Sequence, residues 1–206
     1  MNSTSASALR FPAWVRWAAV IWLMTWAPIY AYVWGPSSFV YLCDIAVILT
    51  CVGLWSGSAL LISSQAVSSL VVDSAWIVDI VWKLLTGWHL IGGTDYFFDV
   101  HYPLWVRMLS LYHVALPIVL VMSLRRTGYD ARGLKLQAII AALAITAAHF
   151  VEPWRNINFS QADPFLHKSW GPAPVHIACM TIGLIVVVYV PTHLVLSRLF
   201  PAAKTG

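Results

Sequence analysis

Charged residues are scarce in this chain of 206 residues. They make up 10% of the sequence, whereas hydrophobic residues make up 60%, and the mean hydropathy is +0.77. A typical soluble domain has about 25% charged residues, so this chain has too few of them to cover a water-facing surface. Intrinsic disorder is excluded by the same figures, because disordered chains are rich in charge and poor in aromatic residues.

Cysteines are few as well, and Cys43, Cys51 and Cys179 each lie in an apolar run, so they cannot build a disulfide framework. The 12 Lys and Arg residues form no long basic run, and the net charge of +4 reflects a shortage of acids, so no nucleic-acid partner is expected. Motifs of common soluble enzymes are also missing, among them the P-loop, GxSxG, HExxH, CxxC and dinucleotide fingerprints. The class of protein that these exclusions leave is a polytopic helical membrane protein.

Long apolar runs dominate what is present. About 20 helical residues cross a hydrocarbon layer of about 30 Å. Six such runs predict an all-α transmembrane bundle, folded as a single domain without a soluble part. The predicted spans cover residues 13–34, 39–55, 59–88, 103–124, 134–152 and 174–199.

The distribution of basic residues predicts the orientation of these spans. Cytoplasmic loops of membrane proteins carry an excess of Lys and Arg. With both termini inside, the cytoplasmic side holds Arg10, Arg16, Arg125, Arg126, Arg132, Lys135, Arg198 and Lys204. The outer side then holds only Lys83, Arg107, Arg155 and Lys168. We therefore expect an N-in, C-in topology in a bacterial inner membrane.

Ionisable residues within the spans are candidates for function, because a charge in hydrocarbon is costly unless it is paired or hydrated. Counting along the helices at about 1.5 Å per residue places five of them in the outer half of the membrane. They are Asp44, His113, His149, Glu152 and His176. We expect them to converge on one polar cavity, and a stripe of Gln65, Ser69 and Asp73 to face the bundle interior. Each side chain is also compatible with a purely structural role.

A cysteine and a histidine in this set suggest acyl chemistry. A thiol becomes a nucleophile when a base removes its proton, so Cys43 would attack and His113 would act as the general base. Asp44 would orient the imidazole. Such a site would hydrolyse or transfer an acyl group on a membrane lipid and would need no cofactor.

Two alternatives stay open. His149, Glu152 and His176 could bind a transition metal, because imidazole and carboxylate groups suit zinc, iron or copper. His149 and His176 could instead ligate a haem. In the other alternative the polar residues line a substrate path, and the chain is a small transporter or a non-catalytic subunit with a membrane-protein partner or a second copy of itself.

The segment from Tyr41 to Ala46, with Cys43 and Asp44 at its centre, together with the lone His113, resembles bacterial six-span integral membrane proteins of the YwaF type. These are similar to the androgen-induced lipid hydrolases and to a transmembrane ether-phospholipid acyltransferase. The resemblance covers predicted spans two to four. It implies lipid chemistry by a nucleophile in an early helix and a histidine in a later one, which Cys43 and His113 match by position.

More of the chain resembles uncharacterised bacterial membrane proteins. The segments concerned are Thr94-Asp95-Tyr96, Gly128-Tyr129-Asp130, Arg155-Asn156-Ile157-Asn158 and Pro191-Thr192-His193. This likeness implies that the outer loops are more than spacers. We expect Asp95, Asp99, Arg155 and Asn158 to belong to a lid over the outer cavity.

Overall fold

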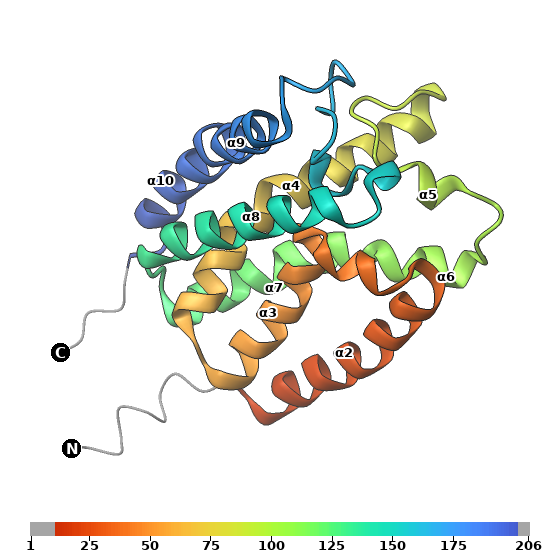
Figure 1. The fold of residues 1–206 in the computed structure, drawn as a ribbon. Coiled ribbons are helices and arrows are strands. Elements are labelled where there is room, and N and C mark those ends of the chain that lie inside the picture. The colour runs from red at the N-terminus through yellow and green to blue at the C-terminus, as the bar shows by residue number, and fades with distance from the viewer. Residues whose placement is uncertain (1–10, 202–206) are drawn as a thin grey trace.

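The computed structural model describes residues 11–201, which form helices and contain no β-strand (Figure 1). The long elements are α2 (Ala13–Trp34), α3 (Leu42–Ser56), α4 (Ala59–Thr86), α7 (Tyr112–Thr127), α8 (Arg132–Phe150), α9 (Ala173–Leu184) and α10 (Val190–Leu199). Short elements connect or extend them. These are η1 (Pro36–Val40), α5 (Asp95–Phe98), α6 (Leu104–Met108), η2 (Leu109–Leu111), η3 (Pro153–Arg155), η4 (Ile157–Phe159) and the π-helical η5 (Ile185–Tyr189).

Within the described residues, five helical segments are long and apolar enough to cross a membrane. They are Ala13–Trp34, Ala59–Thr86, Leu104–Thr127, Arg132–Phe150 and Ala173–Leu199. The helix α3 is apolar but has only 15 residues. The all-helical, membrane-type architecture expected from the sequence is confirmed.

The helix boundaries differ from the predicted spans by a few residues, for local reasons. The second span was expected from residue 39, but α3 begins at Leu42 because Pro36–Val40 form the separate 3-10 helix η1. The fifth span was expected to reach residue 152, but α8 ends at Phe150. Glu152 has a φ of 44°, which lies outside the right-handed helical region.

The helix α4 is the centre of the bundle and packs against α3, α7 and α8. Small residues permit these contacts. A Cβ atom added to Gly133 of α8 would lie 2.9 Å from backbone atoms of Ser63 and Ser64. A Cβ added to Gly53 of α3 would lie 3.0 Å from the Ile62 side chain. Such close approach of helix backbones is typical of helix packing in membranes.

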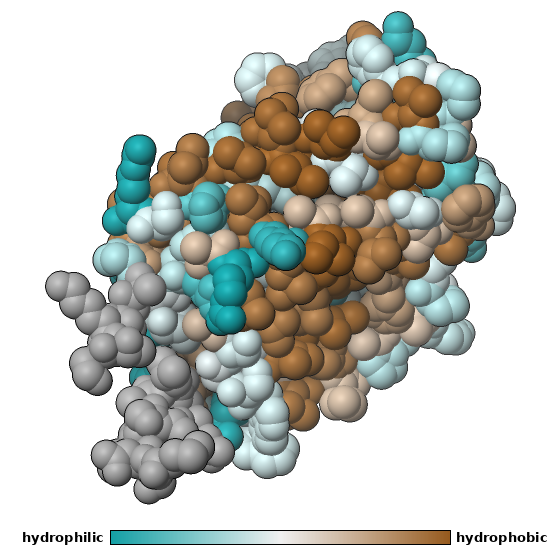
Figure 2. All heavy atoms as spheres, turned by 60° about the vertical axis from the view of Figure 1, so that its left-hand side comes forward, coloured by the Kyte–Doolittle hydropathy of each residue, from teal (hydrophilic) through white to brown (hydrophobic). Residues whose placement is uncertain are grey.

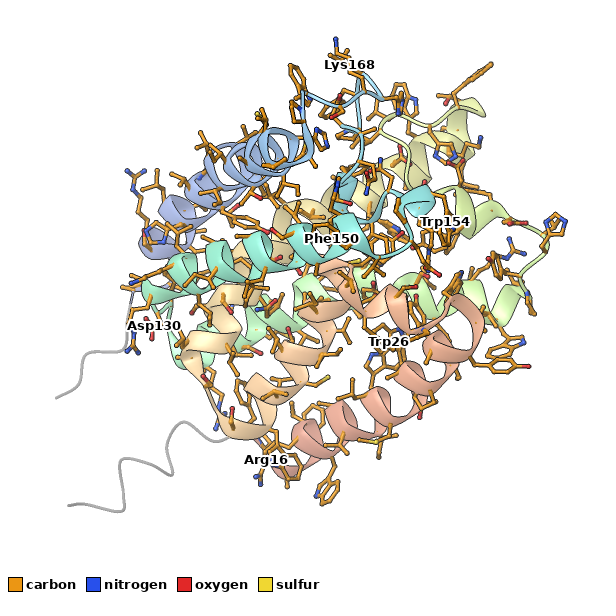
Figure 3. The ribbon with its side chains drawn as sticks, in the orientation of Figure 1. Arg16, Trp26, Asp130, Phe150, Trp154 and Lys168 are labelled. Carbon is orange, nitrogen blue, oxygen red and sulfur yellow. The ribbon has the colours of Figure 1, made fainter. Side chains whose placement is uncertain are left out.

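The surface has the division expected of a chain that crosses a bilayer. Figure 2 shows a broad hydrophobic area in the middle of one face, with hydrophilic side chains gathered toward its edges. Arg16 and Asp130 lie toward one end of the bundle, and Lys168 and Trp154 lie toward the other (Figure 3). Large apolar side chains such as Leu143 and Val187 are exposed on the surface of the bundle.

Candidate functional site

A cavity of about 320 Å³ lies at the end of the bundle where α3 begins and α5 and α6 pack. Its lining residues are Tyr30, Trp34, Ser38, Tyr41, Cys43, Asp44, Trp76, Gly93, Tyr96, Tyr102, Tyr112, His113 and Arg155. Three of the residues singled out from the sequence, Cys43, Asp44 and His113, therefore share one chamber.

The beginning of α3 positions the thiol and the carboxyl. The backbone N–H of Leu42 donates to Asn158 Oδ1 at 3.0 Å, and this side chain caps the helix. Asp44 lies in the first turn, where a negative group is favoured by the helix dipole. It is buried, and the hydroxyl of Tyr112 donates to its Oδ1 at 2.6 Å. The thiol of Cys43 lies 4.0 Å from the same oxygen.

His113 is held between two aromatic rings. Its imidazole stacks on Trp76 at 4.4 Å and on Tyr112 at 4.1 Å between ring centroids. Its Nδ1 lies 2.9 Å from the Ser110 carbonyl oxygen, which can only accept, so Nδ1 carries the proton. The lone pair is therefore on Nε2, which makes no hydrogen bond to any described residue. This is the tautomer of a general base, and Ser110 rather than Asp44 selects it.

Aromatic hydroxyl groups and one arginine form the rest of the wall. The Tyr30 hydroxyl bonds Ser110 Oγ at 2.8 Å, and Trp76 Nε1 donates to the Tyr96 hydroxyl at 3.0 Å. Burial raises the pKa of Tyr96, so this phenol stays protonated. Arg155 supplies a cation at the rim, with its guanidinium 5.7 Å from the Tyr41 ring centroid.

The loop of residues 151–163, which we call the outer loop, carries Arg155 to the cavity. Four of its non-glycine residues have positive φ, an uncommon conformation that persists where the surroundings impose it. They are Glu152, Asn156, Asn158 and Phe159. The Asn158 amide donates to the Val40 carbonyl at 2.8 Å, and Arg155 donates to the Trp34 carbonyl at 2.8 Å. These bonds join the outer loop to the ends of α2 and η1, beside the cavity.

The residues of the expected metal site form hydrogen bonds and an ion pair with residues in or beside this loop. His149 Nδ1 donates to the Ser160 carbonyl at 2.9 Å, and His176 Nε2 donates to the Phe159 carbonyl at 3.0 Å. The other ring nitrogen of His176 accepts from the Trp170 N–H at 3.2 Å. Glu152 accepts from Ser37 and forms an ion pair with Arg155 at 2.9 Å, which lowers its pKa.

The structure therefore does not bring His149, Glu152 and His176 together as ligands. In the part of the chain from 11 to 201, no group of three or more His, Cys, Asp or Glu side chains is arranged to hold a metal ion. Both nitrogens of His176 already have backbone partners, so this histidine has no free position for a haem iron either.

A second loop closes the cavity from the side of α4. Asp79 accepts from the backbone N–H groups of Leu90, Ile91 and Gly92, at 2.6–3.2 Å, and from the hydroxyl of Thr94. His89 bridges Asp79 and Asp95, at 2.9 Å and 2.8 Å. These bonds fix residues 89–95 so that Gly93 reaches the cavity wall.

Sequence reasoning missed several residues of the site. Tyr112 is adjacent to His113 in the chain, and Trp76 lies one helical turn beyond Asp73, but an aromatic residue in an apolar run carries no signal of its own. Asp73 was recognised as part of a polar stripe, and it does not line the cavity. Its carboxyl is fully buried and has no hydrogen-bond partner among the described residues.

No protein-family model, curated protein or solved structure matches this chain. The chemistry of the site therefore follows from its own geometry. That geometry combines a thiol, a histidine with a free Nε2, the buried carboxyl of Asp44 and an arginine at the rim inside an apolar helical bundle.

Proposed function

We propose that this cavity hydrolyses or transfers an acyl group of a membrane lipid, with Cys43 as the nucleophile and His113 as the general base. The observation that carries the proposal is that both side chains line one cavity and that the lone pair of His113 is on Nε2. The proposal agrees with the resemblance of residues 41–46 and His113 to six-span membrane proteins of the YwaF type, which are similar to lipid hydrolases and an acyltransferase.

The reaction proceeds in two steps. His113 Nε2 takes the proton of the Cys43 thiol, and the sulfur attacks the acyl carbon of an ester. The new S–C bond replaces the ester C–O bond, and the imidazolium returns its proton to the departing alkoxide, which leaves as an alcohol. Water then attacks the thioester in hydrolysis, or another hydroxyl group attacks it in transfer. His113 removes the proton of that attacking group and restores the thiol.

Other residues of the wall support this chemistry. The Tyr112 hydroxyl lies beside the thiol and donates its one proton to the Asp44 carboxyl, so it fixes that carboxyl next to Cys43. The guanidinium of Arg155 at the rim suits an anionic headgroup such as a phosphate, because arginine pairs well with phosphate oxygens. The aromatic rings offer apolar walls to the acyl chain.

We further propose that the chain crosses a bacterial inner membrane six times as a single domain, with both termini in the cytoplasm. In this arrangement α3 crosses the membrane in addition to the five longer segments. At about 1.5 Å per residue it covers about 22 Å, so η1 and the outer loop complete its crossing. The cavity then opens in the outer leaflet, where a lipid ester reaches it directly.

A trapping experiment tests the acyl chemistry. The full chain is purified in detergent, incubated with a phospholipid carrying an isotopically labelled acyl chain, quenched in acid and digested. We expect mass spectrometry to find the acyl group as a thioester on the peptide that contains Cys43. Cys43→Ala removes the adduct and lowers ester turnover at least about 100-fold, the effect of removing a nucleophile.

Cys51→Ala is the matched control, because Cys51 is a buried thiol of the same helix that does not line the cavity. It retains both the adduct and the turnover. His113→Asn keeps a polar group of similar size and slows acylation. Full activity of Cys43→Ala would exclude the nucleophile. Absence of turnover in the unmodified protein, together with stoichiometric co-purification of another membrane protein, would favour a non-catalytic subunit.

A further inference from the structure

Aromatic rings form most of the wall of the cavity at the candidate site. Of the described residues that line it, seven are Tyr or Trp, whereas Asp44 is the one acid and Arg155 the one cation. The proposed reaction uses the thiol and the imidazole, and it does not explain why so many rings gather here. The volume of about 320 Å³ is within the range of pockets that hold small ligands.

Four of these rings meet around Trp34, and we call Tyr30, Trp34, Tyr96 and Tyr102 the aromatic corner. The ring centroid of Trp34 lies 4.5 Å from that of Tyr30 and 5.4 Å from that of Tyr102. The Tyr96 ring is 6.2 Å from the same ring. The three tyrosine planes are inclined to the indole plane by 56°, 42° and 81°. Rings inclined in this way present their faces in several directions, as the walls of a corner do, and do not form a flat stack.

Aromatic corners of this kind suit a cation without N–H groups. The face of an aromatic ring is negative, so it attracts cations, and quaternary ammonium ligands are commonly recognised by several rings together. A primary ammonium group needs oxygen acceptors for its N–H donors once it has lost its water. A trimethylammonium group has no such donors, so ring faces are sufficient for it. The carboxyl of Asp44 adds an acidic group to the same cavity.

An anion-binding group lies beside the aromatic corner. Arg155 Nη1 donates to the carbonyl oxygen of Trp34 at 2.8 Å, so the guanidinium is held at this end of the cavity. Arg155 lines the cavity, whereas its ion-pair partner Glu152 does not. Guanidinium groups pair well with phosphate oxygens. The cavity therefore offers a surface for a cation and a partner for a phosphate side by side.

We propose that the cavity receives the phosphocholine headgroup of a membrane lipid, with the trimethylammonium group in the aromatic corner and the phosphate at Arg155. A two-carbon link joins these two groups, so they can reach neighbouring parts of one wall. That such a lipid is the substrate rests on the proposed function, whereas binding of the headgroup does not depend on the reaction. The rings that stack on His113, those of Trp76 and Tyr112, remain available to the ester and the acyl chain.

Binding of ether lipids to the full chain in maltoside detergent tests this site, because an ether lipid has no ester that the protein could cleave. The Tm is measured against the concentration of three dialkyl ether lipids, with phosphocholine, phosphoethanolamine or 3,3-dimethylbutyl phosphate as the headgroup. The last has the shape of phosphocholine without the positive charge. We expect the choline lipid to raise the Tm in a saturable manner, by about 5–10 °C at a hundredfold excess over its dissociation constant. Each of the other two should bind at least about 10-fold more weakly.

Variants locate the two parts of the headgroup. Trp34→Leu should weaken binding of the choline lipid about 10-fold, whereas Trp34→Phe keeps an aromatic face and retains most of the affinity. Arg155→Gln should weaken the choline lipid and the uncharged analogue alike, because both carry the phosphate. Trp88→Leu is the matched control, since Trp88 is 77% exposed and does not line the cavity, and it retains the affinity. If Trp34→Leu does not fold, Tyr102→Leu takes its place.

Several results would overturn the proposal. One is equal affinity for the choline lipid and the uncharged analogue, and another is an affinity that neither Trp34→Leu nor Tyr102→Leu changes. Tighter binding of the ethanolamine lipid would show that hydrogen bonds, and not ring faces, recognise the headgroup. Equal turnover of ester lipids with every headgroup would contradict this inference and leave the acyl chemistry standing. Selective binding of the choline ether lipid without turnover of its ester analogue would support the headgroup site and contradict only the acyl chemistry.

Discussion

The hydrogen bonds of the histidines in this protein indicate two different roles. His113 uses one ring nitrogen to bond the Ser110 carbonyl and leaves the other facing no described partner. His176 uses both nitrogens for backbone groups, one in the segment before α9 and one in the outer loop. A histidine with a free nitrogen in a cavity is able to exchange a proton, whereas a histidine with two backbone partners is a structural anchor.

The phenol of Tyr112 should be important for stability as well as for the site. Tyr112→Phe removes the donor to the buried Asp44 carboxyl. Loss of a hydrogen bond to a buried acidic group costs about 1.5–3 kcal/mol. We expect a fall of that size in the free energy of unfolding, measured by denaturant titration in detergent. Tyr32→Phe, at an exposed position of α2, should change it by less than about 0.5 kcal/mol. Equal effects of the two variants would contradict the assignment.

At the scale of the elements, the contact between α4 and α8 depends on the glycine at position 133, which has no side chain. Gly133→Ala would place a methyl group 2.9 Å from the backbone of Ser63 and Ser64, so the helices must separate. We expect a loss of about 1–3 kcal/mol, as for overpacking in other cores, despite the better helix propensity of alanine.

Gly183→Ala is the matched control for this substitution. Gly183 also lies within a helix, but an added Cβ has nothing within 4 Å. Alanine should therefore stabilise α9 by up to about 1 kcal/mol. Thermal unfolding of both variants under one condition checks the pair, and a stabilising Gly133→Ala would refute the close contact.

The outer loop should respond to acid through Glu152. Its hydrogen bond from Ser37 and its ion pair with Arg155 lower the pKa of this carboxyl below its ordinary value of 4.5. A group with a lowered folded pKa contributes stability above its unfolded pKa, and the contribution disappears as the pH falls through the folded value. We expect Glu152→Gln to lower the Tm at pH 7, and this difference to shrink as the pH falls below 4.5. A difference between the two proteins that does not depend on pH would show that the ion pair contributes nothing.

At the scale of the whole molecule, the proposed orientation predicts which residues the outside medium reaches. Ala131 precedes α8 and Ser169 precedes α9, and both are exposed. In a Cys179→Ala background, Ser169→Cys should react with a membrane-impermeant maleimide in intact cells. Ala131→Cys should react only after the cells are permeabilised. The reverse pattern would invert the proposed topology, and reaction of both in intact cells would contradict an N-in, C-in chain.

The two ends of the described chain lie near the same end of α7. The Tyr129 N–H donates to the Phe200 carbonyl at 2.8 Å, and the Arg126 guanidinium lies 5.8 Å from the Phe11 ring centroid. Phe11 precedes α2 and Phe200 follows α10. The beginning of α2 and the end of α10 therefore lie at the same end of the bundle.

Hydropathy and residue count by themselves predicted an all-helical, membrane-type protein and the depth of its polar groups. Apolar runs of known length predict helices, and the rise per residue predicts that Cys43, Asp44 and His113 lie in the outer half of the membrane. The same count placed His149 and His176 at a similar depth, and it could not reveal that these two face the outer loop.

Only the tertiary structure decided which polar groups meet. The direction in which a helical residue points depends on how its helix rotates and packs, and backbone contacts such as that of Gly133 with Ser63 set this rotation. The stacking of His113 on Trp76, the loop anchors at His149 and His176, and the burial of Asp73 all follow from packing between different segments of the chain. A linear pattern does not contain that information. Hydrophobicity determines how deep a residue lies in the membrane, whereas close packing determines how its helix is rotated about its own axis.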